Sequence, residues 1–134
     1  MTVSDIDEAG GLETLRHIRT AGGRSAFLRA DAGNEADVRA LPAFTETTFG
    51  GLDILANNAG PYFPGERLQH WDETLRANLM GAVYGTFHAI EPMRRRGGGA
   101  IVNYDSSSAV GHGRKDAPSP AYSSTAYSNA GMTP

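Results

Sequence analysis

The stretch that most restricts the fold of this chain is the run at residues 52–60, in which apolar residues give way abruptly to two amides and a tight turn. Its apolar residues fall on both faces of a predicted strand: Leu52, Ile54 and Leu55. That pattern predicts a parallel strand buried between helices. Asn57 and Asn58 then end the strand, at the edge where open α/β sheets bind ligands. The run therefore predicts a strand that opens into a binding site.

Short apolar runs alternate with longer segments of helical periodicity along the rest of the chain. The predicted strands lie within residues 1–7, 25–30, 52–57 and 100–103. The predicted helices cover residues 8–21, 34–49 and 68–96, and a last one begins near residue 121. Strands and helices that alternate with short connections predict parallel βαβ units and right-handed crossovers. The chain is therefore expected to be an α/β protein with a Rossmann-type, doubly wound parallel sheet.

Individual residues mark where these helices should begin, bend and end. Asn34 can cap the second helix with its side chain, and Pro42 should bend the axis of that helix. Gly22 and Gly23 can end the first helix, because glycine readily adopts the left-handed cap conformation. Arg94–Arg96 lie at the end of the long helix, where positive charge complements the helix dipole. Phosphate binding is the less favoured alternative for these arginines.

The composition excludes several classes of function. At 134 residues and a net charge of -3, the chain has room for one domain and lacks a basic surface for nucleic acid. It has no cysteine, which excludes disulfides and thiolate chemistry and favours a reducing compartment such as the cytoplasm. No stretch reaches the roughly 18 apolar residues of a membrane span, so no membrane association is expected. The four histidines lack metal-ligand spacing, so no metal is expected.

The segment Asn57-Asn58-Ala59-Gly60, directly after an apolar strand, resembles the Asn-Asn-Ala-Gly motif of the short-chain dehydrogenase/reductase family. The resemblance implies an oxidoreductase that transfers hydride between NAD(P) and a small-molecule alcohol or carbonyl substrate. It also implies that the sheet starts at the family's second strand and stops after the fifth, so that the first strand and the C-terminal strands are absent. Residues 1–134 would then form one partial NAD(P)-binding, Rossmann-type domain.

Acidic and amide residues at the strand ends are the candidates for cofactor binding. Asp5 ends the first predicted strand, where dinucleotide-binding folds place an acid that accepts hydrogen bonds from the adenosine ribose. Such a carboxylate repels a 2′-phosphate, so NAD is favoured over NADP. The alternative is that Asp5 merely caps the following helix. By resemblance, Asp31 and the backbone of Ala32 hold the adenine ring, and Asn58 contacts a ribose of the cofactor.

Neighbours of these candidates are expected to have other roles. Asn57, beside Asn58 in the same motif, is expected to tie neighbouring strands together rather than to contact the cofactor. Asp7 and Glu8 follow the first predicted strand and are expected to be solvated.

The resemblance also implies three catalytic residues. Tyr122, on the last predicted helix, would give or take the proton of the substrate oxygen, while the hydroxyl of Ser108 would steady that oxygen. Ser106 and Ser107 remain alternatives to Ser108. Asn78, an amide within an apolar helix stripe, would hold a water in a proton relay, or else it is an ordinary buried or surface asparagine.

Two features of the family are missing from these residues. The family places a lysine four residues after the tyrosine, where it lowers the pKa of the phenol, and this chain has Ala126 there. Lys115, the only lysine, lies in a predicted polar loop. No glycine-rich turn that would hold the pyrophosphate lies between a strand and a helix. We therefore expect little turnover from this chain, and the alternative is a non-catalytic Rossmann-fold binding or scaffold protein.

The long helix predicted at residues 68–96 carries more apolar residues than one face of a sheet covers. In the resembling family this helix and the one that begins near Tyr122 pair between subunits, which implies a homodimer or homotetramer for the intact protein. Missing strands should also leave sheet edges open, so we expect the chain alone to be poorly soluble.

Overall fold

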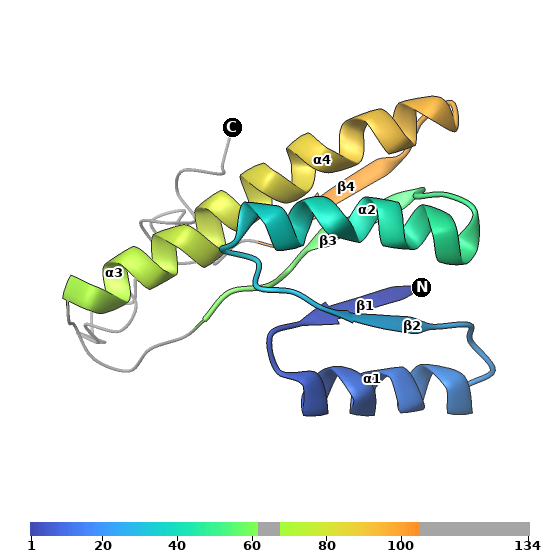
Figure 1. Ribbon diagram of the computed structural model, residues 1–134, viewed down its shortest axis with the longest axis horizontal. Helices are drawn as coiled ribbons and strands as arrows, with labels where there is room; N and C mark the ends of the chain where they lie inside the picture. The colour runs from blue at the N-terminus through green and yellow to red at the C-terminus, as the bar shows by residue number, and fades with distance from the viewer. Residues whose placement is uncertain (62–67, 105–134) are drawn as a thin grey trace, which may run out of the picture.

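The computed structural model describes residues 1–61 and 68–104 (Figure 1). Its strands are β1 (Thr2–Asp5), β2 (Ala26–Arg29), β3 (Ile54–Asn57) and β4 (Ala100–Asn103). Its helices are α1 (Glu8–Thr20), α2 (Glu35–Phe49), α3 (Leu68–Thr74), the π-helical segment η1 (Leu75–Met80) and α4 (Gly81–Arg95). The expected alternation of strands and helices is confirmed over these residues, and the last predicted helix lies outside them.

The helix ends are set by the side chains of single residues. Asn34 caps α2, because its Oδ1 accepts hydrogen bonds from the backbone N–H groups of Ala36 (2.9 Å) and Asp37 (3.4 Å), as the sequence predicts. Asp7 caps α1 by accepting a hydrogen bond from the N–H of Ala9 at 3.1 Å. Asp7 is exposed, as expected, and in addition its side chain caps the helix. The sequence does not separate an acid that caps a helix from one that only faces water.

The strands pair as two separate parallel ladders. β1 pairs with β2, with Thr2 opposite Ala26, and β3 pairs with β4, with Ile54 opposite Ala100. Figure 1 shows all four strands pointing toward the end of the molecule where η1 lies. The parallel pairing confirms the α/β class. Between the described strands, however, hydrogen bonds do not join β1 to β3 into one sheet.

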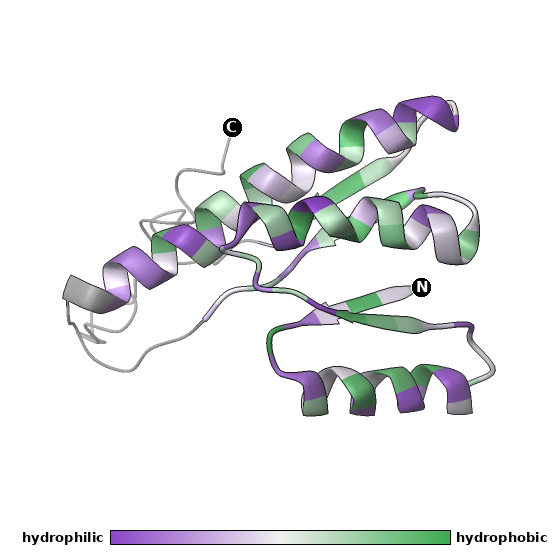
Figure 2. Cartoon of the chain, viewed as in Figure 1, coloured by the Kyte–Doolittle hydropathy of each residue, from purple (hydrophilic) through white to green (hydrophobic). Residues whose placement is uncertain are grey.

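A hydrophobic core cluster lies between β3, β4 and α4. Leu52, Ala89 and Met93 are buried, and Leu55 and Ile101 pack against them. Figure 2 shows how apolar and polar residues alternate along the helices that cover the strands. Ile54, by contrast, is 67% exposed. The expectation that β3 is buried on both faces is therefore wrong, because α4 covers one face of this strand and the described helices leave the other open.

The long helix predicted at residues 68–96 is divided in three. α3, η1 and α4 follow one another along the chain, so its extent is confirmed, but its middle turn has π-helical hydrogen bonding. Such turns are rare and occur often at functional sites. Several apolar side chains of α4 remain exposed: Val83 (47%), Phe87 (71%) and Ile90 (43%). These residues are part of the apolar excess from which the sequence predicts an oligomer.

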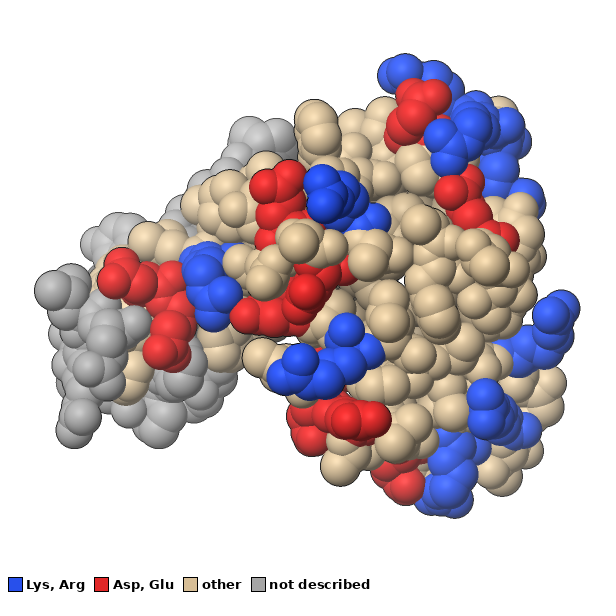
Figure 3. Space-filling view, in the orientation of Figure 1, with Lys and Arg blue, Asp and Glu red and all other residues tan. Residues whose placement is uncertain are grey.

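Arg94 pairs with Glu91 within α4 at 3.2 Å, and the next two arginines pair with acids from neighbouring segments. Arg95 donates to Glu46 of α2 at 2.7 Å. Arg96 donates to the carboxylate of Asp53 at 2.7 Å and to the backbone oxygen of Gly50 at 3.1 Å. Figure 3 shows basic and acidic side chains side by side on the surface there. These contacts favour a structural role over phosphate binding, because they tie α4 to α2 and to the residue before β3.

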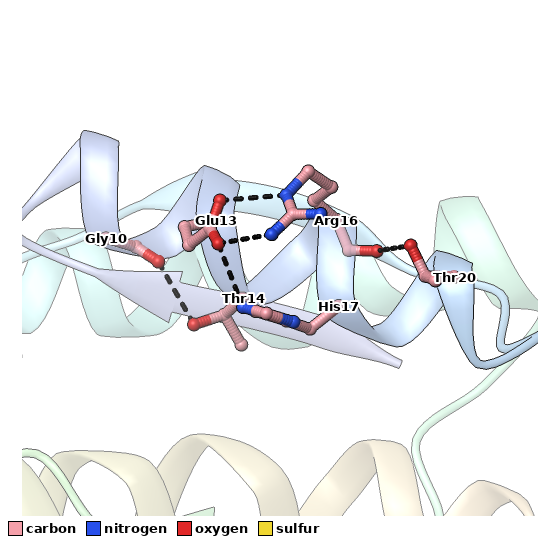
Figure 4. A network of polar contacts seen from close by, with 6 residues as sticks. All are labelled: Gly10, Glu13, Thr14, Arg16, His17 and Thr20. Atoms are coloured by element: carbon pink, nitrogen blue, oxygen red, sulfur yellow. Dashed lines mark hydrogen bonds and ion pairs between the residues drawn. The ribbon is translucent and has the colours of Figure 1, made fainter.

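The exposed face of α1 carries a local polar network, drawn in Figure 4. The guanidinium of Arg16 donates to both carboxylate oxygens of Glu13, at 2.9 and 2.5 Å, and His17 lies 2.9 Å from the same group. The hydrogen bonds from Arg16 lower the pKa of Glu13 from 4.5 to about 2. Pairs three or four residues apart on a helix stabilise it modestly.

The lowered pKa of Glu13 gives a testable pH dependence. Because the carboxyl has a lower pKa in the folded state than in the unfolded state, its stabilising effect is present above pH 4.5 and is lost as the pH falls toward about 2. We predict that Glu13→Gln slightly lowers the unfolding midpoint at pH 7 and has no effect at the acid limit. Side-chain NMR titration checks the cause directly, and a Glu13 midpoint near 4.5 would contradict it.

Candidate functional site

The carboxyl ends of the strands bring the predicted cofactor residues to one edge of the molecule. Asp5 is the last residue of β1 and lies opposite Arg29, the last residue of β2. The Oδ1 atom of Asp5 accepts a hydrogen bond from the N–H of Asp7 at 2.9 Å. Asp5 therefore shapes the turn into α1, while the cap of α1 is Asp7. The alternative that Asp5 caps the helix itself is wrong.

Asp31 is held on three sides in the turn that follows β2. Its Oδ1 accepts a hydrogen bond from the N–H of Gly33 at 2.8 Å, and its own N–H donates to Asp37 at 3.0 Å. Its Oδ2 pairs with Arg76 of η1 at 2.9 Å. The ion pair joins two segments that are 45 residues apart in the sequence. Contacts within the protein therefore already fix the position of the Asp31 carboxylate, which the sequence predicts to lie beside the adenine ring.

Sequence reasoning did not identify Arg76. An arginine two positions before Asn78 looks like an ordinary solvated residue of an amphipathic helix. Ala32, next to Asp31, lies close to the first residue of α4. A β-carbon added at Gly81 would lie only 3.0 Å from the backbone oxygen of Ala32. The turn after β2 therefore packs on the region where η1 becomes α4.

The Arg76–Asp31 pair is expected to contribute little to stability by itself. The side chain of Arg76 is 52% exposed and that of Asp31 is 25% exposed. For such a pair we predict a coupling of about 0.5 kcal/mol, because solvent screens the charges. A double-mutant cycle with Arg76→Gln and Asp31→Asn, followed by urea unfolding, measures the coupling. A coupling above about 2 kcal/mol would show that solvent does not screen this pair.

Asn57, the last residue of β3, ties elements together as the sequence predicts. Its Nδ2 donates to Asn103 of β4 at 2.8 Å. It also lies 3.3 Å from Thr86 and 3.4 Å from the backbone oxygen of Ala82, both in α4. The expectation for Asn57 is confirmed, and its side chain holds the end of β3 against both β4 and α4.

Asn78 meets the turn that follows β3. The residue is 7% exposed, and a β-carbon added at Gly60 would lie 2.0 Å from its Oδ1 atom. Gly60 does not have a positive φ, so the turn needs glycine here for space rather than for its backbone conformation. Asn58, which is exposed, belongs to the same turn. The helix amide predicted to be catalytic and the amide predicted to bind the cofactor therefore lie on one edge.

The remaining predicted catalytic residues lie outside the described residues. These are Ser108, with its alternatives Ser106 and Ser107, and Tyr122. Lys115 and Ala126 lie outside them too. Within residues 1–61 and 68–104, no group of three histidine or acidic side chains could hold a metal ion. Over the same ranges, no helix has both the length and the apolar character needed to cross a membrane.

Comparison with protein families and curated proteins gives a consistent result. Residues 1–133 match the family model described as short chain dehydrogenase. An uncharacterized oxidoreductase of Thermotoga maritima is 37% identical over 114 residues, which are 82% of this chain and 45% of that protein. The 3beta-hydroxysteroid dehydrogenase 1 of Eggerthella lenta is 37% identical over 75% of this chain and 40% of its own length. The chain thus spans about half the length of the relatives it matches.

Solved structures give the same coverage. A Burkholderia xenovorans protein described as a short-chain dehydrogenase/reductase superposes with a TM-score of 0.84 and 32% identity, over 98% of this chain and 51% of that one. A gluconate 5-dehydrogenase from Burkholderia cenocepacia, solved in complex with NADP and tartrate, has a TM-score of 0.79, 24% identity and the same coverage. The second comparison supports the fold alone. Together the superpositions confirm the Rossmann-type class of the fold.

Proposed function

Because this chain belongs to the short-chain dehydrogenase/reductase family, we propose that it carries part of a site for hydride transfer between NAD(P) and an alcohol or carbonyl substrate. The chain covers half of the matched relatives, so the proposal concerns the residues that it contributes to such a site. Those residues are Asp5, Asp31, Ala32 and Asn58 for the cofactor, and Asn78, Ser108 and Tyr122 for catalysis.

The observation that carries the proposal is the contact between the Asn78 amide and the turn that contains Asn58. Gly60 lets the buried side chain of Asn78 approach this turn, and Arg76, two residues earlier, pairs with Asp31 at 2.9 Å. One helical segment thus contacts both the turn assigned to the adenine end and the turn assigned to the ribose. A single elongated cofactor along the strand ends fits this arrangement.

The proposed roles follow from the chemistry of each side chain. Tyr122 moves the proton of the substrate oxygen, Ser108 donates a hydrogen bond to that oxygen, and Asn78 holds a water that relays the proton. When bound, NAD(P) supplies or accepts the hydride. The carboxylate of Asp5 accepts hydrogen bonds from the adenosine ribose and repels a 2′-phosphate, so we propose NAD as the preferred cofactor.

Two absences limit the proposed activity. Ala126 stands where the family has the lysine that lowers the phenol pKa, and an unassisted tyrosine has a pKa of about 10. A glycine-rich turn for the pyrophosphate is also absent from the sequence. We therefore propose little turnover by these 134 residues. The alanine at position 126 favours the second candidate, a Rossmann-fold binding or scaffold protein without catalysis.

The exposed apolar residues of α4 support a further part of the proposal. Val83, Phe87 and Ile90 line one side of this helix, and burying them against a second subunit would stabilise a homodimer or homotetramer of the intact protein. The absence of cysteine fits a cytoplasmic setting.

The proposal predicts a cofactor affinity that depends on charge at one edge of the molecule. We expect Asp5→Asn to weaken NAD⁺ binding about tenfold, because a charge-assisted hydrogen bond to the ribose is lost. The matched control is Asp53→Asn, which removes a carboxylate at the opposite ends of the strands and should leave affinity unchanged. Calorimetric titration measures both variants. Equal effects of the two, or no binding by the parent chain, would overturn the proposed site.

Turnover separates the two candidate functions. NAD⁺ reduction is measured with a panel of secondary alcohols for the parent chain and for Ala126→Lys. We expect cofactor binding in both proteins, with a rate above background in Ala126→Lys that Tyr122→Phe abolishes. Cofactor binding with no rate in either protein would favour the non-catalytic candidate.

A further inference from the structure

The turn that follows β2 uses its first carboxylate to organise its backbone. The N–H of Gly33 donates to Oδ1 of Asp31 at 2.8 Å, and the N–H of Asn34 donates to the backbone oxygen of Asp31 at 2.9 Å. The N–H of Asp31 itself donates to Asp37 at 3.0 Å. Among the described residues, by contrast, the N–H of Ala32 has no hydrogen-bond acceptor. The turn therefore presents the N–H of Ala32 beside the carboxylate of Asp31.

Arg76 binds the second oxygen of this carboxylate. Its Nη1 donates to Oδ2 of Asp31 at 2.9 Å, so donors from two different segments hold the two oxygens. A β-carbon added at Gly33 would lie 2.9 Å from Cγ and 3.0 Å from Nη1 of Arg76, so the arginine side chain lies along the turn. A carboxylate has about four acceptor sites. The position of the carboxylate is thus fixed, and each oxygen can still accept a hydrogen bond from a further donor.

The π-helical turn explains why Arg76 faces this carboxylate. The N–H of Gly81 donates to the backbone oxygen of Arg76, which is the hydrogen bond between residues i and i+5 that defines a π-helix. Arg76 therefore lies one turn below Gly81, where an α-helix would place Ala77. Gly81 also faces the turn after β2, because a β-carbon added to it would lie 3.0 Å from the backbone oxygen of Ala32. In Figure 1 the chain passes from β2 into α2 beside this junction.

We propose that Arg76 is a positioning residue that gives the adenine end of the site its preference for a base with a 6-amino group. The inference rests on the proposed function, which assigns Asp31 and Ala32 to the adenine ring. A 6-amino group donates hydrogen bonds, so it suits the carboxylate of Asp31. The N1 atom of adenine accepts, so it suits the N–H of Ala32. Arg76 acts through Asp31, because it keeps the carboxylate in place for the amino group.

Hypoxanthine reverses both of these hydrogen-bonding groups. Its 6-oxo group accepts where the amino group of adenine donates, and its N1 atom carries a hydrogen. A carboxylate held in place by Arg76 then faces an acceptor, and an unpaired polar group at a binding site costs affinity. Without Arg76 the Oδ2 atom of Asp31 can turn toward water, because this side chain is 25% exposed. The discrimination between the two bases therefore depends on Arg76.

The effect of Arg76 on binding is expected to exceed its small effect on stability. In the unbound protein, solvent screens the ion pair, because the side chain of Arg76 is 52% exposed. A base bound against this turn excludes part of that water, and opposite charges attract more strongly when less water surrounds them. The arginine therefore holds the carboxylate most firmly when the base is in place.

The test compares NAD⁺ with deamino-NAD⁺, the analogue that carries hypoxanthine, because the two have the same charge and differ only at the base. NMR titration of the full chain gives a dissociation constant for each. We expect the parent chain to bind NAD⁺ at least about tenfold more tightly than deamino-NAD⁺. Arg76→Gln should lose about fivefold in affinity for NAD⁺ and change less than about twofold for deamino-NAD⁺. Loss of a positive charge alone would weaken both equally.

Two further variants separate the position of Arg76 from its charge. Arg95→Gln is the matched control, because Arg95 is also 52% exposed and pairs with Glu46 at 2.7 Å, at the far end of α4. It should leave both affinities unchanged. Gly33→Ala keeps every charge and the N–H of residue 33, but its methyl group displaces the side chain of Arg76. It should lower the preference for NAD⁺ as Arg76→Gln does.

A double variant tests whether Arg76 acts through Asp31. Asp31→Asn should bring the two affinities close together, and Arg76→Gln added to it should not change their ratio further. Amide NMR spectra check that each variant is folded. An undiminished preference in Arg76→Gln and Gly33→Ala, or equal losses for the two dinucleotides, would overturn the positioning role and leave the proposed function intact. Binding of neither dinucleotide by the parent chain would overturn the proposed function, and this inference with it.

Discussion

Gly85→Ala is expected to destabilise the folded chain by about 2 kcal/mol, although alanine is the better helix former. Gly85 is buried on α4, and a β-carbon there would lie 2.2 Å from Oδ1 of Asn57 and 3.4 Å from a methyl of Leu55. Neither neighbour can move freely, because Asn57 is hydrogen-bonded to Asn103 at 2.8 Å and Leu55 packs into the core. The added methyl must therefore push α4 away from β3.

The matched control is Gly10→Ala on the exposed side of α1, where the added β-carbon would lie 2.8 Å from Oδ2 of the Asp7 side chain. There we expect a change of less than about 1 kcal/mol, because the gain in helix propensity is offset by a shift of the carboxylate that caps the helix. Asn57→Ala alone should cost about 2 kcal/mol through lost hydrogen bonds. It also vacates the space that the methyl added by Gly85→Ala needs, so the double variant should cost less than the sum of the two. Urea unfolding measures all four proteins, and strict additivity would contradict the assigned clash.

Gly60→Ala is expected to have an effect of similar size at the candidate site. The added β-carbon would lie 2.0 Å from Oδ1 of Asn78, and burial leaves this amide little room to move. We predict a loss of about 1 to 3 kcal/mol, the usual range for an overpacked site. We also expect displacement of the turn that holds Asn58, which should weaken NAD⁺ binding.

Asn78→Ala separates the two causes in this prediction. In the Asn78→Ala background, Gly60→Ala should no longer be destabilising, because the atom it meets is gone. The NMR chemical shift of the Asn58 amide should follow the same pattern. It should change when Gly60→Ala is introduced into the parent chain, and it should not change when Gly60→Ala is introduced into the Asn78→Ala variant. A Gly60→Ala protein as stable as the parent would contradict the contact on which the candidate site depends.

Much of the fold follows from local patterns in the sequence. The cap at Asn34, the glycines after α1 and the alternation of strands and helices depend on neighbouring residues, and each is found where it is expected. The pairing of strands does not follow from them, because it depends on segments far apart in the chain. The exposure of Ile54 is likewise not predictable from local sequence. The residues around Ile54 are those of a strand covered on both faces, and whether a second face is covered depends on distant segments.

The candidate site divides in the same way. The amides after β3 and the acids after β1 and β2 are visible in the sequence, because strand ends mark them. The ion pair of Arg76 with Asp31 joins residues 45 positions apart, and no local pattern distinguishes Arg76 from a solvated arginine. The need for glycine at position 60 is likewise a matter of the space beside Asn78, which the sequence does not describe.

The central claim is that the strand ends and η1 form one site for a nicotinamide cofactor. A spin-labelled NAD⁺ analogue tests it most directly, because the label broadens the NMR signals of nearby residues. We predict that the amides of Asp5, Asp31, Asn58 and Asn78 broaden together, while those of Gly50 and Gly97, beyond the other ends of the strands, stay sharp. Broadening at Gly50 and Gly97, or none at the four predicted residues, would contradict it.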